Sequence, residues 1–201
     1  MRISVRVYIL ITMITSEQAL NRLKEGNARF AAGTPWQAGV SSELRSHLYE
    51  KGQAPYAAIV GCSDSRVPME LIFDAGPGEL FIIRTAGNVV GDFEIGSLEF
   101  AAGTLKTPLI VVVGHQQCGA VKAAIDGGEF PQSLEAVIQE IRCCAPDVSC
   151  CDENTIENKN ILHTLSKIAA NQFISNEVSK GNVYLAAAKY SLETGIVSFL
   201  D

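Results

Sequence analysis

Two short motifs bring together residue types that bind soft metal ions. Cys62 opens a polar run that continues through Asp64 to Arg66, and His115 stands three residues before Cys118. Each motif follows an apolar run of strand length. Two thiolates and one imidazole suit a borderline-soft ion such as zinc, and three protein ligands rather than four leave one position for water or substrate. The pattern therefore predicts a metal site of the catalytic kind.

Taken singly, a cysteine at such a place is more often a small buried hydrophobe, and a histidine there is more often a hydrogen-bonded core residue. The His-x-x-Cys spacing favours a metal site, because it can place an imidazole and a thiolate around one ion. Asp64 and Arg66 admit two interpretations. They form an ordinary ion pair, or a charge-assisted clamp in which Arg66 keeps the Asp64 carboxylate off the metal. Without the clamp, Asp64 is expected to become the fourth ligand and to close the site.

The elements that must position these residues alternate between apolar strands and helices. Strands are expected at residues 56–61, 80–84, 108–114, 183–187 and 196–200, and helices at 17–32, 42–51, 69–74, 93–105, 118–125, 133–143 and 155–179. Continuous apolar strands separated by helices predict an α/β fold, with a mostly parallel central sheet of about four parallel strands flanked by helices. The turn at residues 193–195 predicts an antiparallel edge strand. Because ligands bind at the carboxyl ends of parallel strands, we expect Cys62 and His115 to meet there.

Length and composition favour a single domain over residues 1–201. The chain is 47% hydrophobic and long enough to bury its own core, and no stretch reaches the roughly 18 apolar residues of a membrane span. Sixteen basic and 22 acidic residues give a formal charge of −6, without a basic cluster that would attract nucleic acid. Six cysteines without a loop-rich disulfide framework indicate a reducing compartment. We therefore predict a cytoplasmic protein with neither a membrane nor nucleic acid as partner.

Residues 1–14 are predicted to form an N-terminal arm or extension. Arg2 and Arg6 precede an apolar run and imitate a signal peptide, but no small-residue cleavage site follows. Thr15 and Gln18 instead have the spacing of a helix capping box. A disordered arm, an arm packed on a partner, and translation from Met13 are open alternatives.

A second group of cysteines lies between two expected helices. It consists of Cys143, Cys144, Cys150 and Cys151. A second metal site and a redox switch are alternatives, but neighbouring cysteines do not easily face one ion, and the Cys-x-x-Cys spacing of zinc loops is missing. We expect free thiols at these positions.

The motifs resemble those of the β-class carbonic anhydrases. The resemblance is carried by residues 62–66 (Cys-Ser-Asp-Ser-Arg), 84–88 (Arg-Thr-Ala-Gly-Asn) and 114–120 (Gly-His-Gln-Gln-Cys-Gly-Ala), and it extends from about residue 17 to the end. It implies reversible hydration of carbon dioxide to bicarbonate and a proton, by attack of zinc-bound hydroxide, with Asp64 and Arg66 as catalytic residues. It also implies a homodimer or higher homo-oligomer, in which the N-terminal helices pack on a partner subunit.

The resemblance implies substrate contacts as well. Gln53 matches a glutamine that donates to a substrate oxygen across the dimer interface, Phe81 matches an apolar wall residue, and Gly119 is expected to contact substrate. A solvated loop position is the alternative for Gln53, and core packing is the alternative for Phe81. Two positions depart from the pattern. Phe100 replaces the tyrosine of plant-like members, and Ile59 replaces the tryptophan of bicarbonate-regulated members, so we expect no bicarbonate lock through that pocket.

Two other functions remain open alternatives. One is hydrolysis of carbonyl sulfide or carbon disulfide on the same scaffold. The other is a non-catalytic structural zinc module with four permanent ligands, which the intact Asp64 and Arg66 argue against. For the proton, His47 and His163 have suitable unperturbed pKa values, and buffer or a chain of waters is the alternative.

Overall fold

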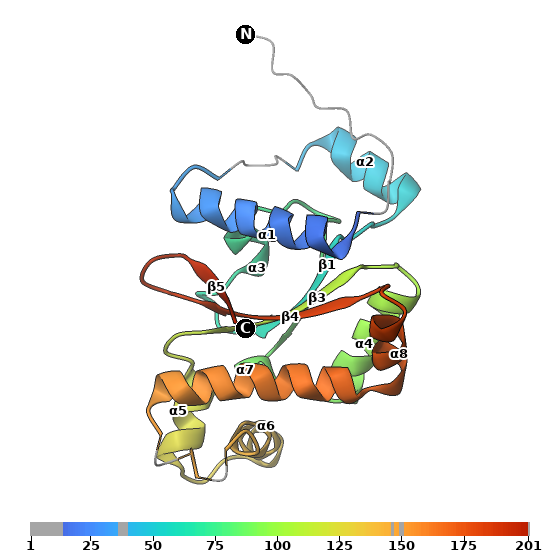
Figure 1. Ribbon diagram of the computed structural model, residues 1–201. Coiled ribbons are helices and arrows are strands. Elements are labelled where there is room, and N and C mark those ends of the chain that lie inside the picture. Colours follow the sequence, from blue (N-terminus) through green and yellow to red (C-terminus); the bar gives the residue numbers. More distant parts are fainter. Residues whose placement is uncertain (1–13, 36–39, 146, 149–150, 201) are drawn as a thin grey trace.

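The computed structural model describes residues 14–35, 40–145, 147–148 and 151–200, and a five-stranded sheet forms its centre (Figure 1). The strand order is β2-β1-β3-β4-β5. The strands are β1 (Ala57–Cys62), β2 (Leu80–Thr85), β3 (Leu109–His115), β4 (Tyr184–Tyr190) and β5 (Val197–Leu200). The first four are parallel, and β5 pairs antiparallel with β4 at the edge. The predicted α/β fold, with its mostly parallel sheet and antiparallel edge strand, is confirmed.

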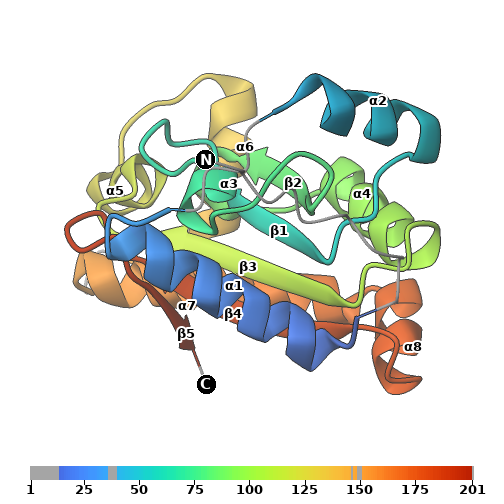
Figure 2. The ribbon, with the colours of Figure 1, turned by 90° about the horizontal axis from the view of Figure 1, so that it is seen from above.

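Helices cover both faces of the sheet (Figures 1 and 2). One face packs against α1 (Ser16–Ala31) and the short α3 (Met69–Ile72), and the other against α4 (Asp92–Gly103), α7 (Glu153–Ala170) and α8 (Gln172–Ser179). Strands β1 and β3 are consequently buried along their whole length. This double cover explains their continuous apolar sequence, which ends where the two motifs begin.

A third cluster of apolar side chains lies at the carboxyl ends of β1 and β3. It joins Cys62 and Cys118 to α5 (Gly119–Asp126), to α6 (Gln132–Arg142) and to the start of α7. Ile138, Ile141 and Ile156 are fully buried in this cluster. The cysteines of the two motifs therefore have a packed, apolar surrounding.

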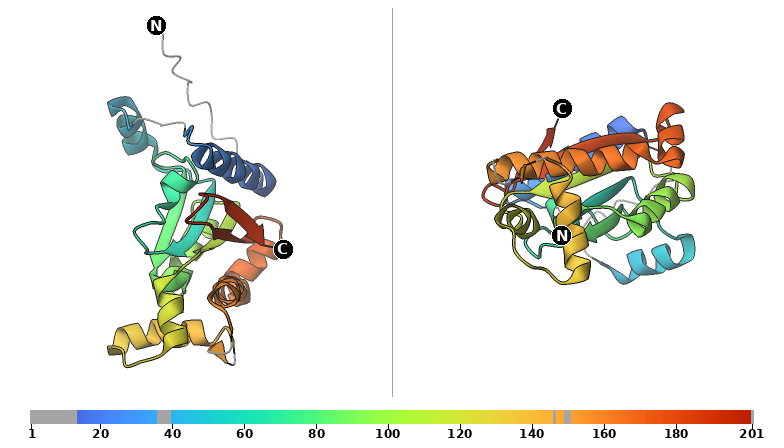
Figure 3. Two further views of the ribbon diagram at one scale, coloured as in Figure 1. Left: turned by 90° about the vertical axis from the view of Figure 1, so that its left-hand side faces the viewer. Right: turned by 90° about the horizontal axis from the view of Figure 1, so that it is seen from below.

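The N-terminal helices differ in how they are packed. The predicted capping box of α1 is present, because the Thr15 hydroxyl accepts from the Gln18 N–H at 3.2 Å and the Gln18 side chain accepts from the Thr15 N–H at 2.8 Å. By contrast, α2 (Ser42–Lys51) buries none of its residues and projects away from the sheet (Figures 1 and 3). Of the predicted arm, residues 1–13 lie outside the described residues.

One predicted helix is two helices. The sequence indicated a single helix over residues 155–179, but α7 ends at Ala170 and α8 begins at Gln172. Asn171 separates them with an extended ψ of 126°, and its side chain accepts from the Ile174 N–H at 3.0 Å as an N-cap. The apolar periodicity continues through the break, so the prediction was wrong at this position. No helix in the described ranges is long and apolar enough to cross a membrane.

Candidate metal centre

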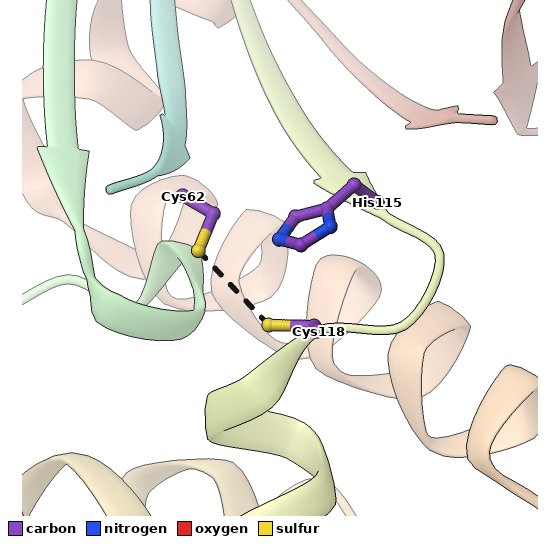
Figure 4. A group of neighbouring side chains, drawn as sticks. All are labelled: Cys62, His115 and Cys118. Carbon is purple, nitrogen blue, oxygen red and sulfur yellow. Dashed lines mark hydrogen bonds between the residues drawn. The ribbon is translucent and has the colours of Figure 1, made fainter. Parts of the chain in front are cut away.

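Cys62, His115 and Cys118 converge at the carboxyl edge of the sheet (Figure 4). Cys62 is the last residue of β1, His115 is the last residue of β3, and Cys118 is the N-cap of α5. All three residues are buried, and their ligand atoms lie within 4.8 Å of one another. The two sulfur atoms are 4.0 Å apart. The structure therefore brings together the three ligands that the sequence predicted.

A tight reversal of the chain returns Cys118 to His115. The Gln116 N–H donates to the Tyr190 carbonyl of β4 at 3.1 Å, which fixes the start of the turn. Gln117 then adopts a left-handed backbone conformation, with φ at 52°. Such a conformation costs a non-glycine residue about 1–3 kcal/mol and persists only where the surrounding structure holds it. The strained turn places the side chains of His115 and Cys118 close together.

The tautomer of His115 leaves one ring nitrogen free to bind a cation. Its Nδ1 lies 2.8 Å from the Gln116 carbonyl, to which it donates as N–H. The lone pair is therefore on Nε2, which is buried and has no hydrogen-bond partner. An orphaned buried nitrogen is unfavourable, and a metal ion would satisfy it. Together with two sulfur atoms, this nitrogen gives a donor set that fits zinc.

The two cysteine sulfur atoms are in hydrogen-bond contact at 4.0 Å, which shifts the pKa values of both thiols. The hydrogen bond from Cys118 lowers the pKa of Cys62 to about 4, and the N–H groups of Asp64 and Gly87, each 3.4 Å from the Cys62 sulfur, add to the effect. The same contact and burial raise the pKa of Cys118. Burial opposes the charged form of His115, but the neighbouring Cys62 sulfur outweighs it and raises the His115 pKa. The contact therefore favours the thiolate form of Cys62, which is the form in which a cysteine binds a metal ion.

Arg66 holds both oxygens of the Asp64 carboxylate. Oδ1 accepts from the Arg66 backbone N–H at 2.9 Å and from Nε at 3.0 Å, and Oδ2 accepts from Nη2 at 2.7 Å. The side-chain hydrogen bonds lower the pKa of Asp64 to about 2. Asp64 Oδ2 lies 3.9 Å from His115 Nε2, so the carboxylate is beside the ligand atoms. Arg66 Nη2 also donates to the Gln117 carbonyl at 3.1 Å and so joins the two motifs.

Other side chains that the sequence did not single out as supports also shape the site. Arg84 donates to the carbonyls of Cys62 and Asp64 at 2.9 and 2.6 Å and so fixes the first motif. Glu157 accepts from the Cys118 N–H at 3.3 Å. The sequence could have pointed to Glu157, because it lies next to Ile156 on the apolar face of a predicted helix. A charged residue is rarely buried unless it is paired.

Not all predicted substrate residues lie at this edge of the sheet. Gly119 follows Cys118 directly and has open space where a side chain would stand. Gln53 is exposed in the segment before β1, and Phe81 lies level with Ala58 near the start of β2. Phe81 packs against Phe100, with ring centroids 6.3 Å apart. Strand β1 (Ala57–Cys62) rises by about 3.3 Å per residue, so it alone separates its amino end, which Gln53 precedes, from Cys62 by roughly 16 Å.

The second cysteine group shows no metal site in the part of the chain that the structure describes. Cys143, Cys144 and Cys151 are free, and within the described ranges Cys62, His115 and Cys118 form the one group of three or more such side chains placed to hold a metal ion. Cys150 lies outside the described residues. His163 is hydrogen-bonded to Glu140 at 3.0 Å.

Fold and site together define an α/β protein with a Cys-His-Cys group that could hold a metal ion and a clamped aspartate at the carboxyl edge of its sheet. The family model for carbonic anhydrase matches residues 57–197. Carbonic anhydrase 2 of Mycobacterium tuberculosis is 38% identical over 187 residues, which cover 88% of this chain and 89% of that protein. The chain therefore belongs to the β-carbonic anhydrases, enzymes whose general reaction is the hydration of carbon dioxide, and the resemblance read from the motifs is confirmed.

Solved structures agree with this assignment. The β-carbonic anhydrase CcaA superimposes with a TM-score of 0.71 at 28% identity, covering 90% of this chain and 95% of that one. A β-carbonic anhydrase of Sordaria macrospora, described as tetrameric, gives a TM-score of 0.72 at 23% identity and covers 86% of this chain and 95% of that one. The second likeness supports the fold alone.

Proposed function

We propose that this enzyme interconverts carbon dioxide and bicarbonate with a zinc ion held by Cys62, His115 and Cys118. The observation that carries the proposal is the buried His115 Nε2, which lacks a hydrogen-bond partner and faces two sulfur atoms. When bound in such a site, zinc supplies a nucleophile by lowering the pKa of a water ligand from about 15.7 toward about 7.

The side chains around the ligands have separate tasks in this proposal. Asp64 stands 3.9 Å from His115 Nε2, where its carboxylate can accept a hydrogen bond from the nucleophile and orient it toward carbon dioxide. Arg66 keeps Asp64 ionised and holds both its oxygens, so that Asp64 does not take the fourth ligand position. The open space beside Gly119 leaves room for the substrate.

A second subunit completes the site in this proposal. Gln53 and Phe81 lie at the opposite end of the strands from the metal ligands of their own chain. Helix α2 buries nothing, and Phe93 at the start of α4 is 89% exposed. We propose that these surfaces pack in a homodimer or higher homo-oligomer, where the partner subunit's Gln53 donates to a substrate oxygen and the partner subunit's Phe81 forms an apolar wall.

The alternatives make different demands on the same residues. A structural zinc module with four permanent ligands would use Asp64 as the fourth, but both oxygens of Asp64 are held by Arg66. Hydrolysis of carbonyl sulfide would use the same ligands, and turnover on both gases separates the two activities. None of the cysteines in the described ranges forms a disulfide, which agrees with the reducing, cytoplasmic location that we propose.

The decisive experiment compares the wild type with Asp64→Asn. Stopped-flow measurement of carbon dioxide hydration is combined with zinc quantitation on the same samples. We expect about one zinc per chain in both proteins. We expect kcat of the variant to fall by about 10²-fold or more, because an amide replaces the Asp64 carboxylate that accepts a hydrogen bond from the reacting group. Equal rates in the two proteins, or a zinc-free active wild type, would contradict the proposal.

A further inference from the structure

A buried carboxylate outside the clamp reaches the backbone of a metal ligand. Glu157 on α7 is 4% exposed, and its Oε1 accepts a hydrogen bond from the Cys118 N–H at 3.3 Å. Cys118 caps α5, where the first N–H groups have no partner within the helix and negative charge is favoured. Glu157 therefore joins α7 to the turn that carries two of the three ligands.

Lys189 neutralises this carboxylate. Its Nζ lies 2.5 Å from Glu157 Oε2, and the Lys189 side chain is only 10% exposed. The same ammonium donates to Asn154 Oδ1 at 2.7 Å. In the register of β3 and β4, Lys189 lies opposite Gly114, the residue before His115. The ion pair thus connects α7, β4 and the start of α5 around the ligand-bearing turn.

The pairing has a physical reason at this place. A lone buried carboxylate next to Cys118 would oppose the thiolate form that metal binding requires, because like charges repel strongly in a region of low dielectric. Lys189 cancels the charge of Glu157 and leaves its oxygen as a hydrogen-bond acceptor. A buried ion pair by itself contributes little to fold stability, whereas a hydrogen bond to the backbone of a ligand fixes where that ligand stands.

We propose that the Glu157–Lys189 pair is a positioning device for Cys118, through which the affinity of the site for its metal depends on two residues that do not touch the ion. The inference rests on the proposed zinc function and deepens it. Neither residue is among the proposed metal ligands or substrate contacts, so we assign both a positioning role rather than a catalytic one.

Metal affinity of the apoprotein tests this role directly. Zinc dissociation constants are measured by competition with a chromophoric chelator, and the cobalt(II)-substituted proteins are compared through their thiolate-to-metal absorption bands. We expect Glu157→Leu and Lys189→Met each to weaken zinc binding by about 10–100-fold, the usual loss for partners of ligands. The double variant Glu157→Gln/Lys189→Met keeps an acceptor without a charge, and we expect it to recover most of the affinity.

A matched control is a second ion pair that involves α7. Glu140 of α6 also pairs with a lysine of α7, Lys167, at 2.7 Å, but it makes none of the hydrogen bonds of the ligand turn. Glu140→Gln is expected to bind zinc as tightly as the wild type. If Glu157→Leu does not fold, Glu157→Asp replaces it, since the shorter carboxylate keeps the charge but cannot span both partners, and its cobalt spectrum is expected to shift.

The outcomes separate this inference from the proposed function. Zinc affinities within about twofold of the wild type in the folded Glu157 and Lys189 variants, with only the melting temperature lowered, would overturn the positioning role and leave the proposed function intact. A double variant as weak as Lys189→Met would also overturn it. A wild type that binds no zinc would overturn both proposals.

Discussion

The Asp64 carboxylate decides whether the fourth position at the metal group stays free. Its two oxygens accept three hydrogen bonds from Arg66, and the pKa of Asp64 falls from 3.8 to about 2. Because the folded value is the lower one, the pair contributes to stability above about pH 4, and the contribution is lost as the pH falls toward 2. Asp64 is therefore ionised throughout the neutral range, and geometry rather than protonation controls its position.

The geometry of the Asp64–Arg66 clamp can be tested by replacing the planar guanidinium of Arg66 with the single ammonium group of lysine. Arg66→Lys keeps the positive charge, but an ammonium cannot donate to both carboxylate oxygens in parallel. We expect kcat/KM for carbon dioxide hydration to fall by about tenfold, corresponding to the loss of roughly one charged hydrogen bond. The zinc content is expected to remain that of the wild type.

The control for this variant is Arg22→Lys, whose carboxylate partner Glu79 hydrogen-bonds to Gly76 N, away from the metal group. Unchanged kcat/KM in Arg66→Lys would show that charge alone holds Asp64. A fall of the same size in both variants would point to a general effect on the fold.

At the scale of elements, the apolar runs in the sequence predicted the positions of the strands. They did not predict which side chains of different elements contact one another. The runs before Cys62 and His115 are continuous because β1 and β3 are covered on both faces, so their carboxyl ends could be located from sequence. The break at Asn171 was missed, because helical periodicity does not register a single capping residue. Glu157 was missed because its partner Lys189 lies 32 residues away on another element. Spacing reports local geometry, whereas such pairs depend on how the elements pack.

The turn after β2 is a second feature that the sequence did not define. Gly87 has a positive φ of 68°, its N–H donates to the Cys62 sulfur, and a side chain there would meet Ile141 at 2.7 Å. We expect Gly87→Ala to lower the free energy of unfolding in urea by about 2–4 kcal/mol, from backbone strain and overpacking together. Zinc binding is expected to weaken as well, because the N–H moves away from Cys62.

Gly181→Ala is the matched control, because Gly181 has a φ of 74° and open space around it. Only the strain is then expected, about 1 kcal/mol, with unchanged zinc affinity. Equal losses in the two variants would show that the packing around Gly87 contributes nothing.

The ion pair between Glu140 of α6 and Lys167 of α7 predicts that the stability of the fold depends on pH. Burial alone would raise the pKa of Glu140, but hydrogen bonds from Lys167 and His163 outweigh burial and lower it below 4.5. A depressed folded pKa means that the link stabilises the protein above about pH 4.5 and is lost as the pH falls through the folded value. We expect Glu140→Gln to be less stable than the wild type by about 0.5–1 kcal/mol at pH 7, and this gap to shrink as the pH falls below about 4.5. Melting curves across this range measure the gap, and a gap of constant size would contradict the assignment.

For the whole molecule, the arrangement of one chain leaves two of its three predicted substrate residues, Gln53 and Phe81, far from its metal group. The metal ligands stand at the carboxyl end of β1, whereas Gln53 precedes its amino end. A twofold interface places the same surface of each subunit against the other. In the homodimer that we propose, the two halves of the site would therefore meet twice, once at each end of the interface. This explains in physical terms why the role of Gln53 could be expected from the resemblance but not from the geometry of a single chain.

Mixing two inactive variants tests whether Gln53 acts within its own chain or across the interface. Asp64→Asn damages the metal half of the site, and Gln53→Ala damages the other half. In a mixed dimer with Gln53 acting across the interface, one site carries both changes and the other carries neither. With random pairing, half of the dimers are mixed, so about a quarter of all sites regain the wild-type set of residues. We expect stopped-flow rates to rise toward about a quarter of the wild-type rate after the variants are unfolded, mixed and refolded together, while each variant refolded alone stays at its low rate. If Gln53 acts within its own chain, every site in the mixed dimer carries one change, and the mixture gains no activity over the average of its parents.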